Sequence, residues 1–142
     1  MIKAIDILAS LINVIRENLK GIHIESREVK EGYRRKSIYI YLDDTQVSNY
    51  MEQYRETETT AKIIYFPERD YNTEELLEIQ EKLNEIFADK YCIDVCDISM
   101  ELKDPSSVIS DGVLLFNFDV YVFEEYPKPT AEMMEELYIR EV

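Results

Sequence analysis

The chain has 142 residues, a formal net charge of −14 at pH 7 and a single histidine. Hydrophobic residues make up 46% of the sequence, which suits one folded domain with a buried core and excludes a disordered chain. No apolar run approaches the roughly 18 residues of a membrane span, and the first residues lack the apolar block of a signal peptide, so we expect a cytoplasmic protein that does not enter a membrane.

The first predicted element is an amphipathic helix that Gly21 ends. Its polar face mixes acidic and basic residues, which favours docking on a protein core over lying on a membrane surface. The apolar stripe recurs at three- and four-residue steps and is widened by Ile7 and Val14. It comprises Ile2, Ile5, Leu8, Leu11, Ile12, Ile15 and Leu19.

Strand-like sequence follows this helix. Residues 37–42 alternate cleanly, with Ile38, Ile40 and Leu42 on the face that we expect to be buried. Residues 43–54 are polar and irregular and are interpreted as a loop or an extended excursion. Two further strands are expected at residues 22–29 and 57–66, the second ending at Pro67.

A second helix is predicted to begin after Asn72, which is a good N-cap residue. Glu75 is placed to reach back to the start of this helix in a variant of the capping box. The outer face is acidic, and glutamates near the helix start suit the helix dipole. The buried stripe is predicted to be Leu76, Ile79, Leu83, Ile86 and Phe87.

Two long strands complete the predicted sheet. In the first, residues 91–102, the apolar residues change face, so we predict a β-bulge or a change of neighbour between Val95 and Asp97. Residues 104–112 are expected to be a turn-rich connection. The second strand, residues 113–123, alternates most clearly. It should bury Leu114, Phe116, Phe118, Val120 and Val122.

Residues 124–142 are interpreted as a Pro-broken C-terminal arm with a short helix after Thr130. Such a helix is too short to be stable alone, so it must dock either on its own subunit or on a neighbour. The order of elements predicts an α+β fold in a single domain, residues 1–142. We expect one mostly antiparallel β-sheet of about five strands, packed by two main helices, plus the short C-terminal helix.

The sequence offers little for catalysis. His23 lies between two isoleucines with no nucleophile signature to serve, and three glycines cannot build a phosphate-binding loop. Cys92 and Cys96 should lie about 13 Å apart in one strand, too far for a disulfide, and are expected to be buried reduced thiols. We therefore expect no enzyme, no cofactor and no metal. The acidic groups interpreted as solvated surface are Asp43 with Asp44, Asp94 with Asp97, and Asp119 with Glu124 and Glu125.

Charge is distributed unevenly along the chain. Residues 1–36 carry eight Lys/Arg against five Asp/Glu, a net of +3, whereas residues 37–142 carry eight against 25, a net of −17. Tyrosines interleave with the basic stretch, a pattern that can serve single-stranded nucleic acid, but the field of an acidic protein opposes it. A contact with an acidic protein surface fits better. The candidate subunit interface is Arg27, Lys30, Arg34, Arg35 and Lys36.

Five segments carry a resemblance to a known family. They are the opening helix IKAIDILASLINVIRENL, the strand KSIYIYLDD, the strand end IIYFPE, the helix NTEELLEIQEKLNEIF and the closing strand VLLFNFDVYVF with its Pro-broken tail. The order and general character of these segments, which span nearly all of the chain, resemble those of the tail terminator (tail completion) proteins. These proteins belong to long-tailed phages, prophages and phage-tail-like bacteriocins of Gram-positive bacteria.

The resemblance implies a structural subunit that forms a homo-oligomeric ring, typically of six. The ring would cap the head-proximal end of the tail tube, stop tube and sheath polymerisation, and meet the head–tail connector if a head is present. The subunit would occur in the host cytoplasm during assembly and then in the virion or phage-tail-like particle. In such a ring, the uneven charge of the sequence leads us to expect the basic residues at a contact with a neighbouring subunit or the tube. Two alternatives stay open: a connector or tube-related structural protein, and an acidic adaptor or inhibitor that binds a host protein.

Overall fold

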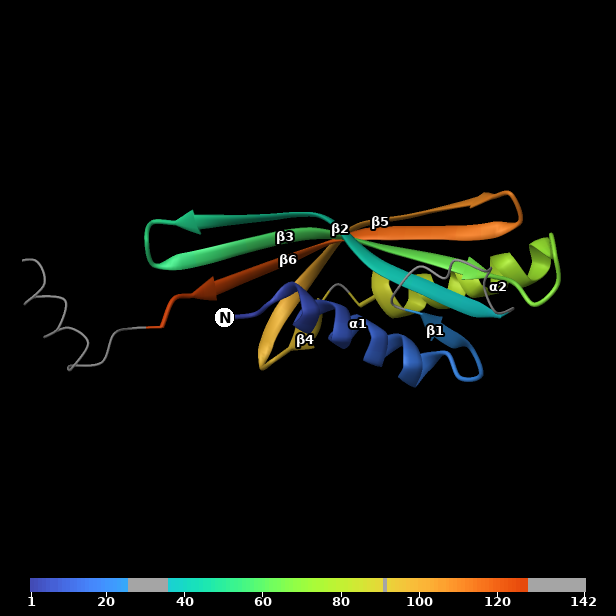
Figure 1. Cartoon of the computed structure of the whole chain (residues 1–142), viewed down its shortest axis with the longest axis horizontal. Helices are drawn as coiled ribbons and strands as arrows, with labels where there is room; N and C mark the ends of the chain where they lie inside the picture. The colour runs from blue at the N-terminus through green and yellow to red at the C-terminus, as the bar shows by residue number, and fades with distance from the viewer. Residues whose placement is uncertain (26–35, 91, 128–142) are drawn as a thin grey trace, which may run out of the picture.

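The computed structural model describes residues 1–25, 36–90 and 92–127 (Figure 1). Six strands within these residues form one sheet in the order β1-β2-β3-β6-β5-β4, and all neighbours are antiparallel except β1 and β2. This confirms the expected α+β fold with a mostly antiparallel sheet, which has one more strand than the five expected. The strands are β1 (His23–Glu25), β2 (Ser37–Tyr50), β3 (Tyr54–Phe66), β4 (Cys92–Val95), β5 (Ile98–Ser110) and β6 (Val113–Glu125).

The described helices lie on one face of the sheet and leave the other face free of helix (Figure 1). They are α1 (Ala4–Asn18), α2 (Thr73–Leu83) and a π-helical turn, η1 (Asn84–Ala88), that continues α2. α1 contacts both β2 and β4, which lie near opposite edges of the sheet, so the sheet curls around this helix. α2 and η1 contact β6 and β5. The core therefore lies between the curled sheet and the helices.

α1 confirms the predicted opening helix but shifts its buried stripe. Ile7, which the sequence placed at the margin of the stripe, is fully buried, whereas Ile5 is 71% exposed. Residues two positions apart on an α-helix point about 200° away from each other, so the burial of Ile7 turns Ile5 toward solvent. The Asp6 carboxylate accepts the Lys3 N–H at 2.9 Å at the helix start. Gly21, with a φ of +82°, follows the end of the helix as predicted.

Of the two interpretations of residues 43–54, the structure supports the extended excursion and not the loop, because β2 and β3 form one long hairpin there. The alternation before it is confirmed, since Ile38 and Ile40 are fully buried. From Asp43 onward every residue of β2 is exposed. This half of the hairpin, with the end of β6, forms an arm that projects past the helices at the left of Figure 1. Its polar composition reflects the lack of a covering helix, and backbone pairing holds it extended.

α2 confirms the predicted N-cap, because the Asn72 side-chain oxygen accepts the Glu75 N–H at 3.3 Å. Glu75 reaches back to the helix start as expected, because its Oε2 accepts the Asn72 side-chain amide at 3.4 Å. Its Oε1 accepts the Tyr65 hydroxyl and the Glu68 N–H, which the sequence did not predict, so this side chain also joins α2 to the end of β3. The predicted stripe is confirmed, with Leu76, Ile79 and Leu83 in α2 and Ile86 and Phe87 in η1 all buried.

Two predictions on the last strands are wrong because the chain turns more tightly than expected. The change of face after Val95 is neither a bulge nor a new neighbour, but a two-residue turn at Cys96 and Asp97, both with positive φ, that separates β4 from β5. Residues 104–110, expected to be a connection, belong to β5, and only residues 111–112 turn. β6 is confirmed, and its five predicted core residues are all buried.

The expected burial of the thiols is also wrong. Cys92 and Cys96 are exposed free cysteines, since one lies on the edge strand β4 and the other in the turn that follows it. Glu124 and Glu125, expected in the C-terminal arm, are the last residues of β6. Glu124 is only 4% exposed, and its Oε1 accepts the Ile2 N–H at 2.8 Å. The expected C-terminal helix falls on residues 128–142, outside the described residues.

Candidate assembly surfaces

Of the predicted interface residues, only Lys36 belongs to the part of the chain that the structure describes. Its carbonyl accepts the His23 N–H at 3.2 Å, where β1 joins the sheet beside β2. Lys36 lines a depression of about 300 Å³ together with four glutamates of the β3–α2 region. Its positive charge is therefore set among acidic groups of its own chain. The other four residues, Arg27, Lys30, Arg34 and Arg35, lie outside the described residues, so the basic interface stays a prediction.

The histidine and the acidic residues considered as candidates for catalysis or metal binding do not come together in one site. His23 is exposed on β1. Asp43 forms an ion pair with Lys62 at 3.0 Å, and Asp119 accepts the Thr60 hydroxyl at 2.9 Å. Glu124 lies on the opposite face of β6 from Asp119, as odd and even residues of a strand must. Across residues 1–25, 36–90 and 92–127, no three His, Cys, Asp or Glu side chains are grouped to hold a metal ion.

The helix-free face of the sheet is acidic. The pairing of β2, β3, β6 and β5 places six acidic residues and two lysines on the described part of this face. Lys62 binds Asp43, which lowers the pKa of the aspartate and raises the pKa of the lysine. The Lys103 ammonium lies over the Tyr121 ring, 4.4 Å from its centroid. The acidic residues are Asp43, Glu56, Glu58, Glu101, Asp119 and Glu125.

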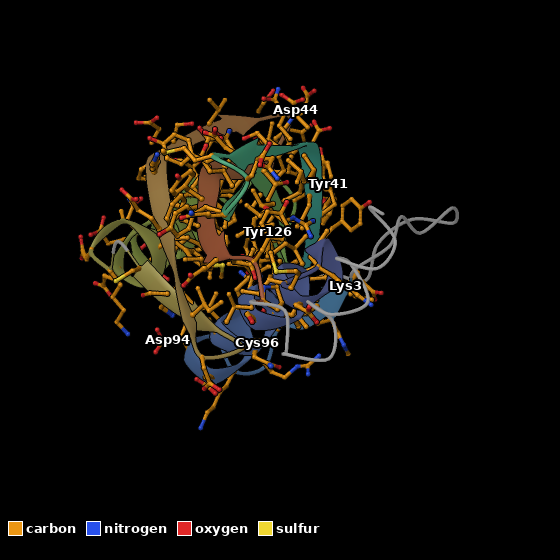
Figure 2. All side chains as sticks on the ribbon, turned by 90° about the vertical axis from the view of Figure 1, so that its left-hand side faces the viewer. Lys3, Tyr41, Asp44, Asp94, Cys96 and Tyr126 are labelled. Atoms are coloured by element: carbon orange, nitrogen blue, oxygen red, sulfur yellow. The ribbon has the colours of Figure 1, made fainter. Side chains whose placement is uncertain are left out.

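The tip of the arm carries an exposed aromatic cluster. The Phe123 ring stacks on Tyr54 at a centroid distance of 4.8 Å and meets Tyr50 edge-on at 6.3 Å. Met51, in the turn, is 72% exposed. Figure 2 looks at the molecule from this end and shows Tyr126 near the centre, where its N–H donates to the Gln53 carbonyl at 2.8 Å. The arm thus presents apolar side chains away from the core.

The family comparison decides the identity of the chain. A sequence profile of one family, described as phage tail terminator protein, matches residues 6–132, which is 127 of the 142 residues. The chain belongs to the phage tail terminator family. That family is structural and non-enzymatic, so this terminator is a component of phage tails with a role in tail completion. The resemblance is confirmed at the level of the family, while an origin in Gram-positive phages or bacteriocins stays a prediction.

A search of curated proteins finds no match to the terminator chain. None of the helices in the described residues is long and apolar enough to cross a membrane.

Sequence reasoning missed the arm of this terminator. Tyr50, Met51 and Tyr54 fell within the segment interpreted as a loop or an extended excursion, so their place at the tip of a hairpin was not foreseen. One signal was available. Residues 45–51 contain no charged residue, although 32% of the chain is charged and acidic residues flank this run on both sides.

Proposed function

We propose that this terminator closes into a ring that caps the head-proximal end of a phage tail tube. The ring stops tube and sheath polymerisation there and forms the surface that the head–tail connector meets, and the family resemblance leads us to expect six copies. The observation that carries the proposal is the family match across residues 6–132. The architecture supports it, because a head-to-tail ring needs two unlike patches on each subunit. This subunit has one face covered by helices, one bare acidic face and two different sheet edges.

The mass of the purified chain in solution tests the ring. Light scattering should give a single multiple of the 16.9 kDa subunit mass, and negative-stain images should show closed particles of one size. A stable monomer at every concentration and salt would support the adaptor or inhibitor alternative. Tubes of indefinite length would support a tube subunit.

Length control is tested with the tube protein encoded nearest to this chain. Terminator added below the stoichiometric amount to polymerising tube protein should shorten the tubes as its concentration rises, and gold-labelled terminator should lie at one end. Binding along the whole tube, or no change in length, would contradict the capping role.

The predicted basic interface has its own test. Replacing Arg34, Arg35 and Lys36 together by Glu should abolish ring formation or tail-length control. The matched control replaces Lys3, Lys20 and Lys90 by Glu, because these exposed lysines give the same change in net charge. If the first variant kept both ring size and length control, the basic residues would not lie at an interface.

Gene order tests the assignment to a particle. Capsid and connector genes upstream, with tube and sheath genes downstream, would support a terminator of a contractile phage tail. Tail genes without capsid genes would indicate a headless particle, and a metabolic operon would contradict the proposal.

A further inference from the structure

Two strands of the sheet have a long edge that no described strand pairs. β1 covers β2 only along Ser37–Tyr39, and β4 covers β5 only along Ile98–Glu101. Within the described residues, the rest of β2 pairs only with β3, and the rest of β5 pairs only with β6. The backbone N–H and C=O groups along such an edge are able to pair with a further strand.

The outer part of each open edge is uncharged. Residues 45–51 (TQVSNYM) are all exposed, and residues 105–110 (PSSVIS) are exposed apart from Ser107. Soluble proteins usually guard open edges with charged side chains, and this chain is 32% charged, so two uncharged edges are unexpected. Apolar side chains stand on both, since Val47 is 52% and Val108 58% exposed.

Each strand has one feature that interrupts pairing along its edge, and it leaves most of the edge open. A register irregularity separates Asp43 from Gln46 in β2, and another separates Lys103 from Ser106 in β5. Pro105, which lacks an N–H, lies within the second irregularity. Both irregularities lie at the inner end of an uncharged run, so the backbone groups along the outer part of each run are not paired with a described strand.

We propose that the β2 edge of one copy, residues 45–51, pairs with the β5 edge of the next copy, residues 105–110, and that this contact joins the subunits of the ring. The inference rests on the proposed ring and names the surfaces that close it. Each copy carries a net charge of −14, so a contact between two uncharged edges brings the fewest like charges together. The two edges lie on opposite sides of β3 and β6, so each copy keeps one edge open for the next.

Strand direction is compatible with this contact. Three successive antiparallel pairings separate β2 from β5, so these strands run in opposite directions within one copy. Copies related by rotation about an axis close to the strand direction keep these directions. The β2 edge of one copy and the β5 edge of the next are therefore antiparallel, and the alternation of the sheet continues across the contact.

The offset between the two edges suits a closed ring. Ser48 and Ser106 both lie on the helix-free face, as partners across a contact must. Followed across the sheet, Ser48 is level with Glu56 and Ser106 with Lys62, an offset of six residues along β3. This offset, at roughly 3.3 Å per residue over four strands about 4.8 Å apart, corresponds to a strand tilt of about 45°. Closed barrels tilt their strands by about 35–45°, so a pairing of Ser48 with Ser106 closes with little distortion.

Charge reversal tests the pairing. Gln46→Lys with Ser48→Lys places two cations on the β2 edge, and Ser106→Lys with Val108→Lys does so on the β5 edge; all four side chains lie on the helix-free face. Lysines on both edges should raise the concentration for half-assembly at least about tenfold, since like charges then face each other. Gln46→Lys and Ser48→Lys combined with Ser106→Glu and Val108→Glu should restore assembly, more strongly at low salt.

The control carries the same added charge of +4 away from the edges. Asn13→Lys, Leu77→Lys and Glu81→Lys together alter three exposed helix positions, and this variant should assemble like the wild type. If the wild type assembles and the variant with lysines on both edges assembles equally well, the edge contact is overturned while the ring proposal stands. If the wild type stays monomeric, both are overturned. Failure of the Lys/Glu combination to assemble, with folding intact by circular dichroism, also overturns the pairing.

Cross-linking tests the same contact with milder changes. In a background of Cys92→Ser and Cys96→Ser, Ser48→Cys and Ser106→Cys are made as separate chains and mixed under oxidising conditions. Disulfide-linked dimers should form in the mixture and not with either chain alone. Dimers formed by Ser48→Cys alone would indicate that two β2 edges pair with each other, and would overturn the head-to-tail contact.

Discussion

The Glu75 side chain links three parts of the chain, and its contribution to stability is measurable. One carboxylate oxygen accepts the Tyr65 hydroxyl at 2.7 Å and the Glu68 N–H at 2.9 Å, while the other lies 3.4 Å from the Asn72 amide nitrogen. These contacts join the end of β3, the following connection and the start of α2. Tyr65 is only 1% exposed, so Tyr65→Phe removes the hydroxyl while the ring still fills its place in the core.

We expect Tyr65→Phe to lower the free energy of unfolding by about 1–2 kcal/mol. A hydrogen bond to an ionised group contributes about 1.5–3 kcal/mol, but Glu75 is only partly buried, so water replaces part of the lost bond. Glu75→Gln keeps a similar shape without the charge and should cost about 1 kcal/mol. If both changes act through one bond, the double variant should lose about 1 kcal/mol less than the sum of the single losses.

Denaturant unfolding of the wild type, both single variants and the double variant measures this coupling. Each lost kcal/mol should also lower Tm by about 2–4 °C in a chain near this size. All measurements need one protein concentration, because assembly adds stability that depends on concentration. Tyr71→Phe is the matched control, since Tyr71 is 73% exposed and should change little. A coupling below about 0.3 kcal/mol would refute the reasoning.

The same link predicts a dependence on pH. Burial acts to raise the pKa of Glu75, but hydrogen bonds from the Glu68 amide and the Tyr65 hydroxyl outweigh it and hold the pKa below its ordinary value of 4.5. A carboxyl with a lowered pKa in the folded state stabilises the fold above its unfolded pKa, and that contribution is lost as pH falls through the folded pKa. The stability difference between the wild type and Glu75→Gln should therefore shrink between pH 7 and about pH 3.

Three further predictions concern the core, a turn and the thiols. Phe87→Ala should cost about 3–5 kcal/mol in thermal unfolding, because Phe87 is 1% exposed and stacks on Phe118 at 4.6 Å; a loss below about 1.5 kcal/mol would contradict close packing there. Cys96→Asn with Asp97→Gly should raise stability by about 1–2 kcal/mol, because both positions have positive φ and Asn-Gly favours such a turn; a lower Tm would contradict this. Cys92 and Cys96 should both react with a thiol reagent in the native protein nearly as fast as in urea, since both are exposed, and a single adduct by mass spectrometry would count against it.

Periodicity located the elements that bury one face against the core. The stripe of α2 and η1 and the alternation of β6 were predicted residue by residue, because a helix or strand with one buried face must repeat apolar residues at its own period. The same logic failed for Ile5, which fits the period of α1 but lies on its exposed side. Apolar residues on two sides of one helix leave its rotation open until its neighbours are known.

The failures elsewhere have a common cause. Residues 43–50 were left open between a loop and an extended excursion because their side chains are polar, whereas backbone pairing with β3 makes them a strand. The turn at Cys96 and Asp97 contains no glycine or asparagine, and one aspartate is a weak turn signal in a chain so rich in acidic residues. The predicted basic interface lies mainly outside the described residues, and the open edges could not be predicted, since edge status depends on strand order.

The sequence by itself determined the acidic character of the chain, its two main helices, its strongest strands and its resemblance to tail terminators. These properties reside in local composition and short-range periodicity, which need no knowledge of distant contacts. Only the tertiary structure decided which surfaces remain uncovered: the helix-free acidic face, the aromatic tip of the arm, and the edges of β2 and β5. Their exposure depends on how far β1 and β4 extend along their neighbours and on where the helices end, and segments distant in sequence set both.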